Sequence, residues 1–239
     1  RWRVIFFFKE QAAYEREGGL VDSEMLIRDK VKRSVLRALR EYETDEVITF
    51  ILDIMENEEN DFLISAALST LIKIDLDKAQ EKFDWAMEQE SKSETIRSTA
   101  LGILTEEKTD SNLIKLKDMA VYGAAPYNLR GSIFSRITDY QEDNPDLIDY
   151  FADHINDPHR RVRWTCANQI IRHGNIDQFG EFLEMADAEP LRGGKIADIY
   201  SALDKRLAKL KKSKDRKGAK EIEKMQKMFA ESAEEWGNN

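Results

Sequence analysis

Cysteine is almost absent from this sequence, because Cys166 is the single one among 239 residues and no disulfide can form within the chain. Such cysteine usage is typical of a reducing compartment and predicts a cytoplasmic location. Proline (4) and glycine (11) are also scarce, which is little turn chemistry for an all-β fold. No apolar run approaches the roughly 20 residues of a membrane-spanning helix, so we expect no membrane contact.

Positive charge is in short supply, since the formal net charge is −9. This balance argues against a nucleic-acid partner. The charge is uneven along the chain: residues 41–61 hold nine acidic residues and no basic one, and residues 205–220 hold nine lysines and arginines against one aspartate. We interpret both runs as solvated helix surfaces. A nucleic acid or an acidic membrane is the alternative ligand for the basic run, but the run is poor in the aromatic residues that bind single strands.

A nine-residue frame recurs along the chain and reads apolar, Lys or Arg, two variable residues, small or apolar, apolar, two variable residues, apolar. It occurs as "VKRSVLRAL", "IRSTALGIL", "LRGSIFSRI" and "VRWTCANQI", with weaker copies "LISAALSTL" and "LRGGKIADI". In chain order the copies begin at 31, 63, 96, 129, 162 and 191, so the gaps are 32, 33, 33, 33 and 29 residues. The apolar positions of the frame form one stripe on an α-helix.

A second helical pattern follows each of the first five frames, as in "DEVITFILDIME" and "NPDLIDYFADHI". Each unit therefore reads as a helical hairpin, which cannot bury its apolar stripes alone but can do so by stacking on its neighbours. The sequence predicts an all-α fold, a right-handed α-solenoid of five to six repeats with a charged C-terminal helix. We expect residues 18–239 to form this domain and residues 1–17 to be the remnant of an upstream element.

The chemistry of the repeats identifies a family. Ankyrin and tetratricopeptide signatures are absent, whereas "DPHRRVRWTCANQIIRHGNI" resembles HEAT repeats, with Asp-Pro, then Val-Arg, then an apolar stripe. "SETIRSTALGIL", "MAVYGAAPYNLRGSIFSRI" and the charged tail from Ala197 together resemble the C-terminal helical domain of gluzincin aminopeptidases, which are similar to membrane alanyl aminopeptidase. The resemblance covers roughly Gly18 to Trp236.

The resemblance implies a non-catalytic domain that caps the active-site cavity of a zinc aminopeptidase and packs on its catalytic domain. The catalytic His-Glu-x-x-His motif is missing, because no Glu follows His154, His159 or His173. We therefore expect no catalytic residue, no metal ligand and no cofactor in this chain, and zinc only in an upstream catalytic domain of the same polypeptide. The alternative is a free-standing HEAT-repeat scaffold that binds a protein partner. A HEAT-like DNA alkylation-repair glycosylase ranks third, because it would need a basic groove.

The second frame position carries a recurrent cation, and we call this set the basic ladder. Its members are Lys32, Arg97, Arg130, Arg163 and Arg192. An anion-binding row is one interpretation. We favour structural support, in which each cation holds an aspartate or carbonyls of a neighbouring turn by charge-assisted hydrogen bonds.

Three further residues mark a possible interaction surface. Trp164 lies off the apolar stripe beside Arg160 and Arg161, and Trp and Arg are enriched in binding hot spots. Packing of Trp164 on the adjacent repeat is an equal alternative. Cys166 occupies the small position of its frame, which predicts a buried thiol and not a nucleophile.

Overall fold

The described part of the chain is helical throughout. The computed structural model describes residues 22–189, 191 and 194–237, and every regular element among them is a helix. This confirms the predicted all-α class. The expected upstream remnant, residues 1–17, lies outside the described residues. None of the described helices is long and apolar enough to cross a membrane.

The chain divides into two compact units, residues 1–118 and 119–239, with the boundary inside one helix. Unit 1 contains α2 (Asp22–Ala38), α3 (Asp45–Asn57), α4 (Asp61–Ile74), α5 (Leu76–Glu81), α6 (Phe83–Glu88), α7 (Thr95–Ala100), α8 (Ile103–Glu106) and most of α9 (Asp110–Ala120), with short 3₁₀ turns η2 (Leu39–Glu41) and η3 (Lys92–Glu94). Unit 2 contains α10 (Tyr127–Ile137), η4 (Thr138–Tyr140), α11 (Leu147–Asp153), α12 (Arg160–His173), α13 (Ile176–Ala188), α14 (Gly194–Lys212) and α15 (Arg216–Gly237). The regular spacing of the frames gave no signal of this division.

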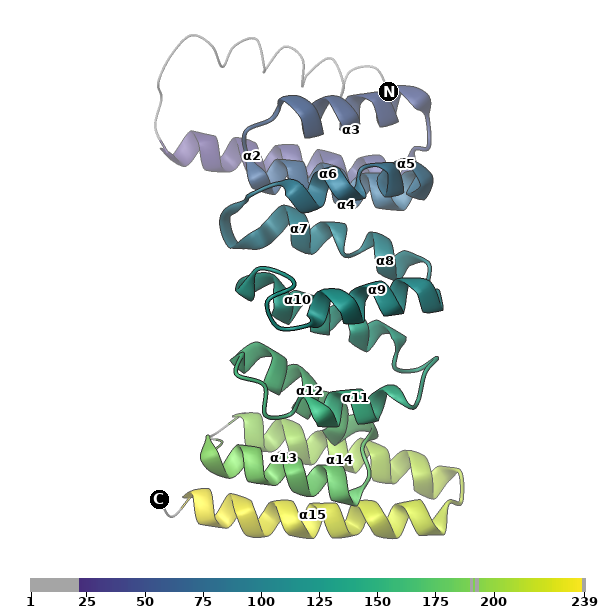
Figure 1. The fold of residues 1–239 in the computed structure, drawn as a ribbon, viewed down its shortest axis with the longest axis vertical. Coiled ribbons are helices and arrows are strands. Elements are labelled where there is room, and N and C mark those ends of the chain that lie inside the picture. The colour runs from purple at the N-terminus through teal and green to yellow at the C-terminus, as the bar shows by residue number, and fades with distance from the viewer. Residues whose placement is uncertain (1–21, 190, 192–193, 238–239) are drawn as a thin grey trace. The chain divides into compact units, whose positions relative to one another are not determined.

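The helices that carry the frame pack on one another in chain order within each unit (Figure 1). In unit 1, α4 contacts both α2 and α7, and in unit 2, α12 contacts both α10 and α14. In α4 and α12 the apolar stripes predicted from the frame are buried: Leu63 and Ala67 of α4 are at most 1% exposed, and Val162 and Cys166 of α12 are fully buried. In α2 the stripe departs from the prediction, because Val31 is 45% exposed. The second helix of each hairpin packs on the frame helices: α3 contacts α4, and α11 contacts α12.

Local capping explains several boundaries. The Thr44 hydroxyl accepts a hydrogen bond from the Val47 N–H at the start of α3, and the Asp75 carboxylate accepts one from the Lys78 N–H at the start of α5. Both residues occupy the N-cap positions that the sequence indicates, where a side-chain oxygen satisfies an otherwise unpaired amide. Gly123 ends the preceding helical segment with a φ of 87°, a left-handed conformation that suits glycine.

Other expected helices differ from the sequence pattern. "LDKAQEKFDWAMEQE" forms two helices, α5 and α6, because the backbone leaves the helical conformation at Lys82 (φ −92°, ψ 0°). The third frame is also interrupted, between α7 and α8, where the Gly102 N–H bonds to the Thr99 carbonyl three residues back and tightens the turn. α10 begins at Tyr127, with Pro126 at its N-cap position, so Asn128 lies inside the helix and does not cap it.

Close packing of α10 on α12 depends on Gly131. A Cβ atom added to Gly131 would lie 2.6 Å from Arg161 Cδ and 3.0 Å from Arg161 Cγ. The Arg161 side chain therefore crosses α10 at the one position without a side chain. Gly180 in α13 is a helical glycine with nothing within 4 Å of an added Cβ.

These two glycines predict opposite effects of the same substitution. Gly180→Ala should stabilise the protein by about 0.5–1 kcal/mol, because alanine has the higher helix propensity. Gly131→Ala gains the same propensity but must displace the Arg161 stem, so we expect a net destabilisation of about 1–3 kcal/mol. Urea unfolding followed by circular dichroism measures both. Equal stabilisation by the two alanines would show that the α10–α12 contact is loose.

Candidate functional site

The basic ladder binds the ends of preceding helices. Arg97 donates from Nε to the Met87 carbonyl at 2.7 Å, near the end of α6, and Arg130 donates from Nε to the Ala120 carbonyl at 2.7 Å, at the end of α9. Arg163 donates to the carbonyls of Asp157 and Pro158 at 2.9 and 3.1 Å. The last carbonyls of a helix have no intrahelical partner, so the guanidinium groups satisfy acceptors that would otherwise need water.

Three ladder members also reach an acid 26 or 27 residues further along the chain. Lys32 pairs with Glu58 at 3.3 Å, Arg130 with Asp157, and Arg163 with Glu189 at 3.3 Å. The Arg130–Asp157 pair is the most buried, with 4% and 5% of the two side chains exposed. The Asp157 carboxylate also accepts the His159 N–H at 2.8 Å. Arg130 and Arg163 therefore join the turn before their own helix to the turn before the next frame. Lys32 joins its own helix, α2, to the turn before the next frame.

Arg97 lacks such an acid. The same offset from Arg97 reaches Gly123 and Ala124, and Arg97 bonds instead to Glu94 at 2.8 Å, three residues before it. Arg192 lies outside the described residues. The contacts of the four described members are those expected for structural support, and each guanidinium or ammonium group has a protein partner.

The predicted interaction residues of α12 point in different directions. Arg160 pairs with Glu189 at 3.2 Å and keeps 66% of its side chain exposed. Arg161 instead lies on α10, where it contacts Gly131 and donates to Ser132 Oγ at 3.4 Å. Trp164 lies below Lys195 of α14, whose Nζ is 4.1 Å from the ring centroid. The structure thus brings Arg160 and Trp164 together and separates Arg161 from them.

A cleft with a volume of about 540 Å³ lies beside Trp164. It is lined by Arg160, Trp164, Glu189, Leu191, Gly194, Lys195 and Asp198. Its charged residues include both signs, and Glu189 is already held by Arg160 and Arg163. The Trp164 indole N–H is buried and has no hydrogen-bond partner among the described residues. The cleft therefore combines one aromatic surface with balanced charge.

Sequence reasoning missed a second set of exposed side chains in unit 2. Val121, Tyr122 and Tyr127, which flank the loop "GAAP", are 60%, 67% and 55% exposed. The Tyr127 and His159 rings are in contact at a centroid distance of 4.2 Å and an interplanar angle of 38°. The centroid of the Tyr122 ring lies 5.7 Å from the Arg130 guanidinium carbon. The sequence offered one indication of this exposure, because these residues lie outside the apolar stripe of the frame.

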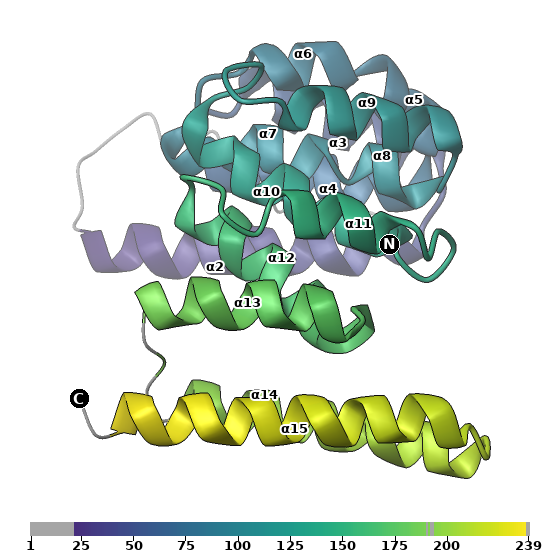
Figure 2. The ribbon, with the colours of Figure 1, turned by 60° about the horizontal axis from the view of Figure 1, so that its bottom comes forward.

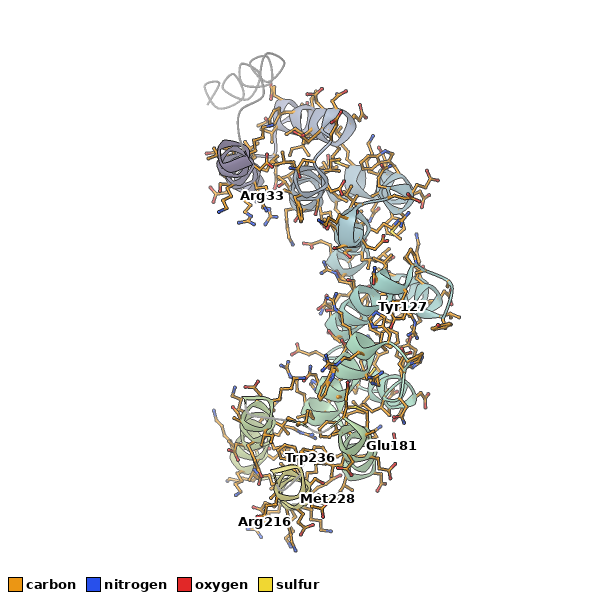
Figure 3. The ribbon with its side chains drawn as sticks, turned by 90° about the vertical axis from the view of Figure 1, so that its left-hand side faces the viewer. Arg33, Tyr127, Glu181, Arg216, Met228 and Trp236 are labelled. Atoms are coloured by element: carbon orange, nitrogen blue, oxygen red, sulfur yellow. The ribbon has the colours of Figure 1, made fainter. Side chains whose placement is uncertain are left out.

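The contact between Tyr127 and His159 places the exposed Tyr127 beside the start of α12. We call Tyr122, Tyr127, His159, Arg160 and Trp164 together the aromatic edge. His159 is the N-cap residue of α12, and its Nδ1 accepts the Arg161 N–H at 3.1 Å. The N-terminal ends of α10 and α12 lie on the same side of unit 2 in Figure 1, and Figure 3 labels Tyr127 at the start of α10.

The histidines do not gather into a site. His154 Nδ1 bonds to the Tyr150 carbonyl at 2.8 Å, while His159 caps α12. Burial, followed by the nearby Arg206 charge, lowers the pKa of His173 at the other end of α12. Among the described residues, no group of three or more histidine, cysteine, aspartate or glutamate side chains is placed to hold a metal ion.

Cys166 is fully buried in α12, as the frame predicts. Burial raises the pKa of its thiol far above the ordinary value, which keeps the sulfur protonated and weakly nucleophilic. Burial also raises the pKa of Tyr150 to about 12. Both groups belong to the core.

Comparisons with protein-family models, with curated proteins and with solved structures returned no match.

The buried Arg130–Asp157 pair predicts a large cost when one partner is removed. We expect Arg130→Met or Asp157→Ala to lower the free energy of unfolding by about 3–5 kcal/mol, because the remaining charge stays buried without its partner. The double variant Arg130→Met/Asp157→Ala should lose much less than the sum of the two single variants. Chemical denaturation of all three variants tests this.

Arg136→Ala is the matched control, since it removes an exposed pair with Asp139 at 3.8 Å. Exposed pairs contribute about 0–1 kcal/mol. Similar losses for Arg130→Met and Arg136→Ala would contradict the assigned importance of the ladder.

The burial of Cys166 predicts a protected thiol. Disulfide-exchange reagents at neutral pH should modify the native protein at least about 1,000-fold more slowly than the unfolded chain, because reaction requires opening of the α12 core. Absorbance of the released thiolate gives both rates. Fast labelling of the folded protein would show that the thiol is accessible.

Proposed function

We propose that this chain is a non-catalytic helical-repeat domain that acts by binding a protein through the aromatic edge. The observation that carries the proposal is the exposure of Tyr122 and Tyr127, of which Tyr127 contacts His159 at the start of the helix that carries Arg160 and Trp164. Tyr, Trp and Arg dominate binding hot spots because they bury large areas and offer polar groups at low entropic cost. The basic ladder, in contrast, is committed to contacts within the chain.

The proposal includes an architecture, a right-handed α-solenoid of HEAT-like repeats. The serial packing of α2, α4 and α7 in unit 1 and of α10, α12 and α14 in unit 2 supports it. So does the repeated placement of a cation between two turns. In a solenoid each repeat contacts only its neighbours, and the repeated loops present an extended binding surface.

The partner that the sequence favours is the catalytic domain of a zinc aminopeptidase in the same polypeptide. The support is the resemblance of "MAVYGAAPYNLRGSIFSRI" to the C-terminal domain of that family, and this stretch contains both exposed tyrosines. The domain would then limit access to a cavity in the catalytic half. A separate protein partner of a free-standing scaffold is the alternative, and the same surface would serve it.

A hydrolysis assay tests the non-catalytic part of the proposal. The purified chain, supplied with Zn²⁺, should release no product from aminoacyl amides above the rate of buffer with Zn²⁺ alone. Translation of the reading frame before Arg1 shows whether a His-Glu-x-x-His motif precedes it. Zinc-dependent turnover by this chain would overturn the proposal outright.

A binding experiment tests the surface. The polypeptide encoded before Arg1 is produced separately, and its affinity for this chain is measured by calorimetry. Tyr122→Ser/Tyr127→Ser should weaken binding by about 10-fold or more, as expected for hot-spot residues. Phe62→Ser/Ile114→Ser is the matched control, because these unit 1 side chains are 51% and 59% exposed. An equal loss in both variants would remove the aromatic edge as the binding surface.

A further inference from the structure

The tip of the α14–α15 hairpin carries the densest positive charge of unit 2. In Figure 2, α14 and α15 lie side by side, and α15 also contacts α13. Within residues 205–220 all the cations but one are exposed at this tip; these are Lys205, Lys209, Lys211, Lys212, Lys214, Arg216, Lys217 and Lys220. Arg216, which Figure 3 labels, is the first residue of α15 and directly follows the turn.

Arg206, the remaining cation, has a structural role that distinguishes it from this group. It donates to the carbonyls of Ile171 and Gly174 at 2.8 Å each, and so binds the end of α12. Burial lowers the pKa of its guanidinium group. Arg206 therefore holds α14 to the end of α12 and is not part of the exposed group.

The turn between the helices does not need the lysine side chains. The Ser213, Lys214 and Asp215 N–H groups bond to the carbonyls of Lys209, Lys211 and Leu210 at 3.0–3.2 Å, which satisfies the end of α14. The Asp215 carboxylate caps α15 by accepting the Gly218 N–H at 3.0 Å. The backbone and one aspartate therefore build the turn, although the α14 dipole does favour cations at its end.

Acidic residues near the tip are engaged elsewhere or neutralise little of its charge. Glu221 accepts the Ile176 N–H at the start of α13 at 2.9 Å, and Asp204 accepts the Gln226 amide at 2.7 Å. Glu223 pairs with Lys211 at 3.1 Å, in an exposed contact. A compact group of exposed cations remains, in a chain whose net charge is −9.

We propose that this tip, Lys205–Lys220, is a docking surface for an acidic segment of a protein partner. Charge complementarity selects an anionic ligand. The tip has no exposed aromatic residue for base stacking and no exposed large apolar side chain for insertion into a lipid surface. A short acidic segment contacts the tip alone, whereas duplex DNA or a charged membrane would also meet the acidic remainder of the chain.

A binding assay with a defined probe tests this inference. The probe is a short fluorescein-labelled peptide of alternating glutamate and serine, and anisotropy is recorded with the full chain. We expect binding at about 0.05 M salt that weakens strongly at about 0.3 M, because the contact is electrostatic and exposed. Lys209→Gln/Lys212→Gln/Lys217→Gln should weaken it by about 10-fold or more.

The matched control removes the same charge from other exposed lysines. Lys30→Gln/Lys92→Gln/Lys108→Gln should change the affinity by less than about 2-fold, because these residues lie outside the α14–α15 hairpin. All six lysines are exposed, and glutamine keeps the helix propensity, so both variants should fold as the parent does. Equal loss of affinity in the two variants, or no binding of the peptide by the parent chain, would overturn the inference.

Two competing ligands complete the design. A duplex DNA of equal charge and vesicles with phosphatidylserine should each bind more weakly than the peptide, and tighter binding of either would overturn the assignment to a protein segment. The Tyr122→Ser/Tyr127→Ser variant should bind the peptide as the parent does. This arm separates failure of the tip from failure of the aromatic edge.

Discussion

Charge-assisted hydrogen bonding across the turns is the interaction on which the described hairpins depend. A helix end exposes carbonyls without partners, and a short connecting turn cannot satisfy them all. Arginines at the second frame position meet this need in several hairpins, as Arg130 does for the Ala120 carbonyl and for Asp157. Because the same cation touches the turn before and the turn after, it sets the separation of successive hairpins.

This constraint also shapes the surface that remains for function. Cations committed to the ladder are unavailable to ligands, and the buried stripes of the frame fill the core. What stays exposed lies in the turns and off the stripe, where Tyr122 and Tyr127 are found. The tip of α14–α15 is exposed for the same reason, since its turn is closed by backbone bonds and by Asp215. Binding surfaces and structural contacts are thus separated along the chain.

The repeat made much of the fold predictable from the sequence. The period located the frame helices, the frame assigned Cys166 to the core, and polar residues such as Thr44 marked helix starts. The breaks at Lys82 and Gly102 were not foreseen, because they arise from local backbone geometry within apolar patterns that still read as helical. The exposed tyrosines were missed because their exposure depends on the path of the loop. A search for acids 26 or 27 residues after each cation would have found Glu58, Asp157 and Glu189.

Native-state hydrogen exchange on the Asp157→Asn variant tests the central claim about the ladder most directly. If Arg130 and Asp157 couple neighbouring hairpins, amides of α10 and α12 should lose protection together, by similar free energies, although the substitution lies in the turn between α11 and α12. A loss of protection confined to the amides of residues 154–161 would contradict the claim, because it would make the pair a local feature of one turn.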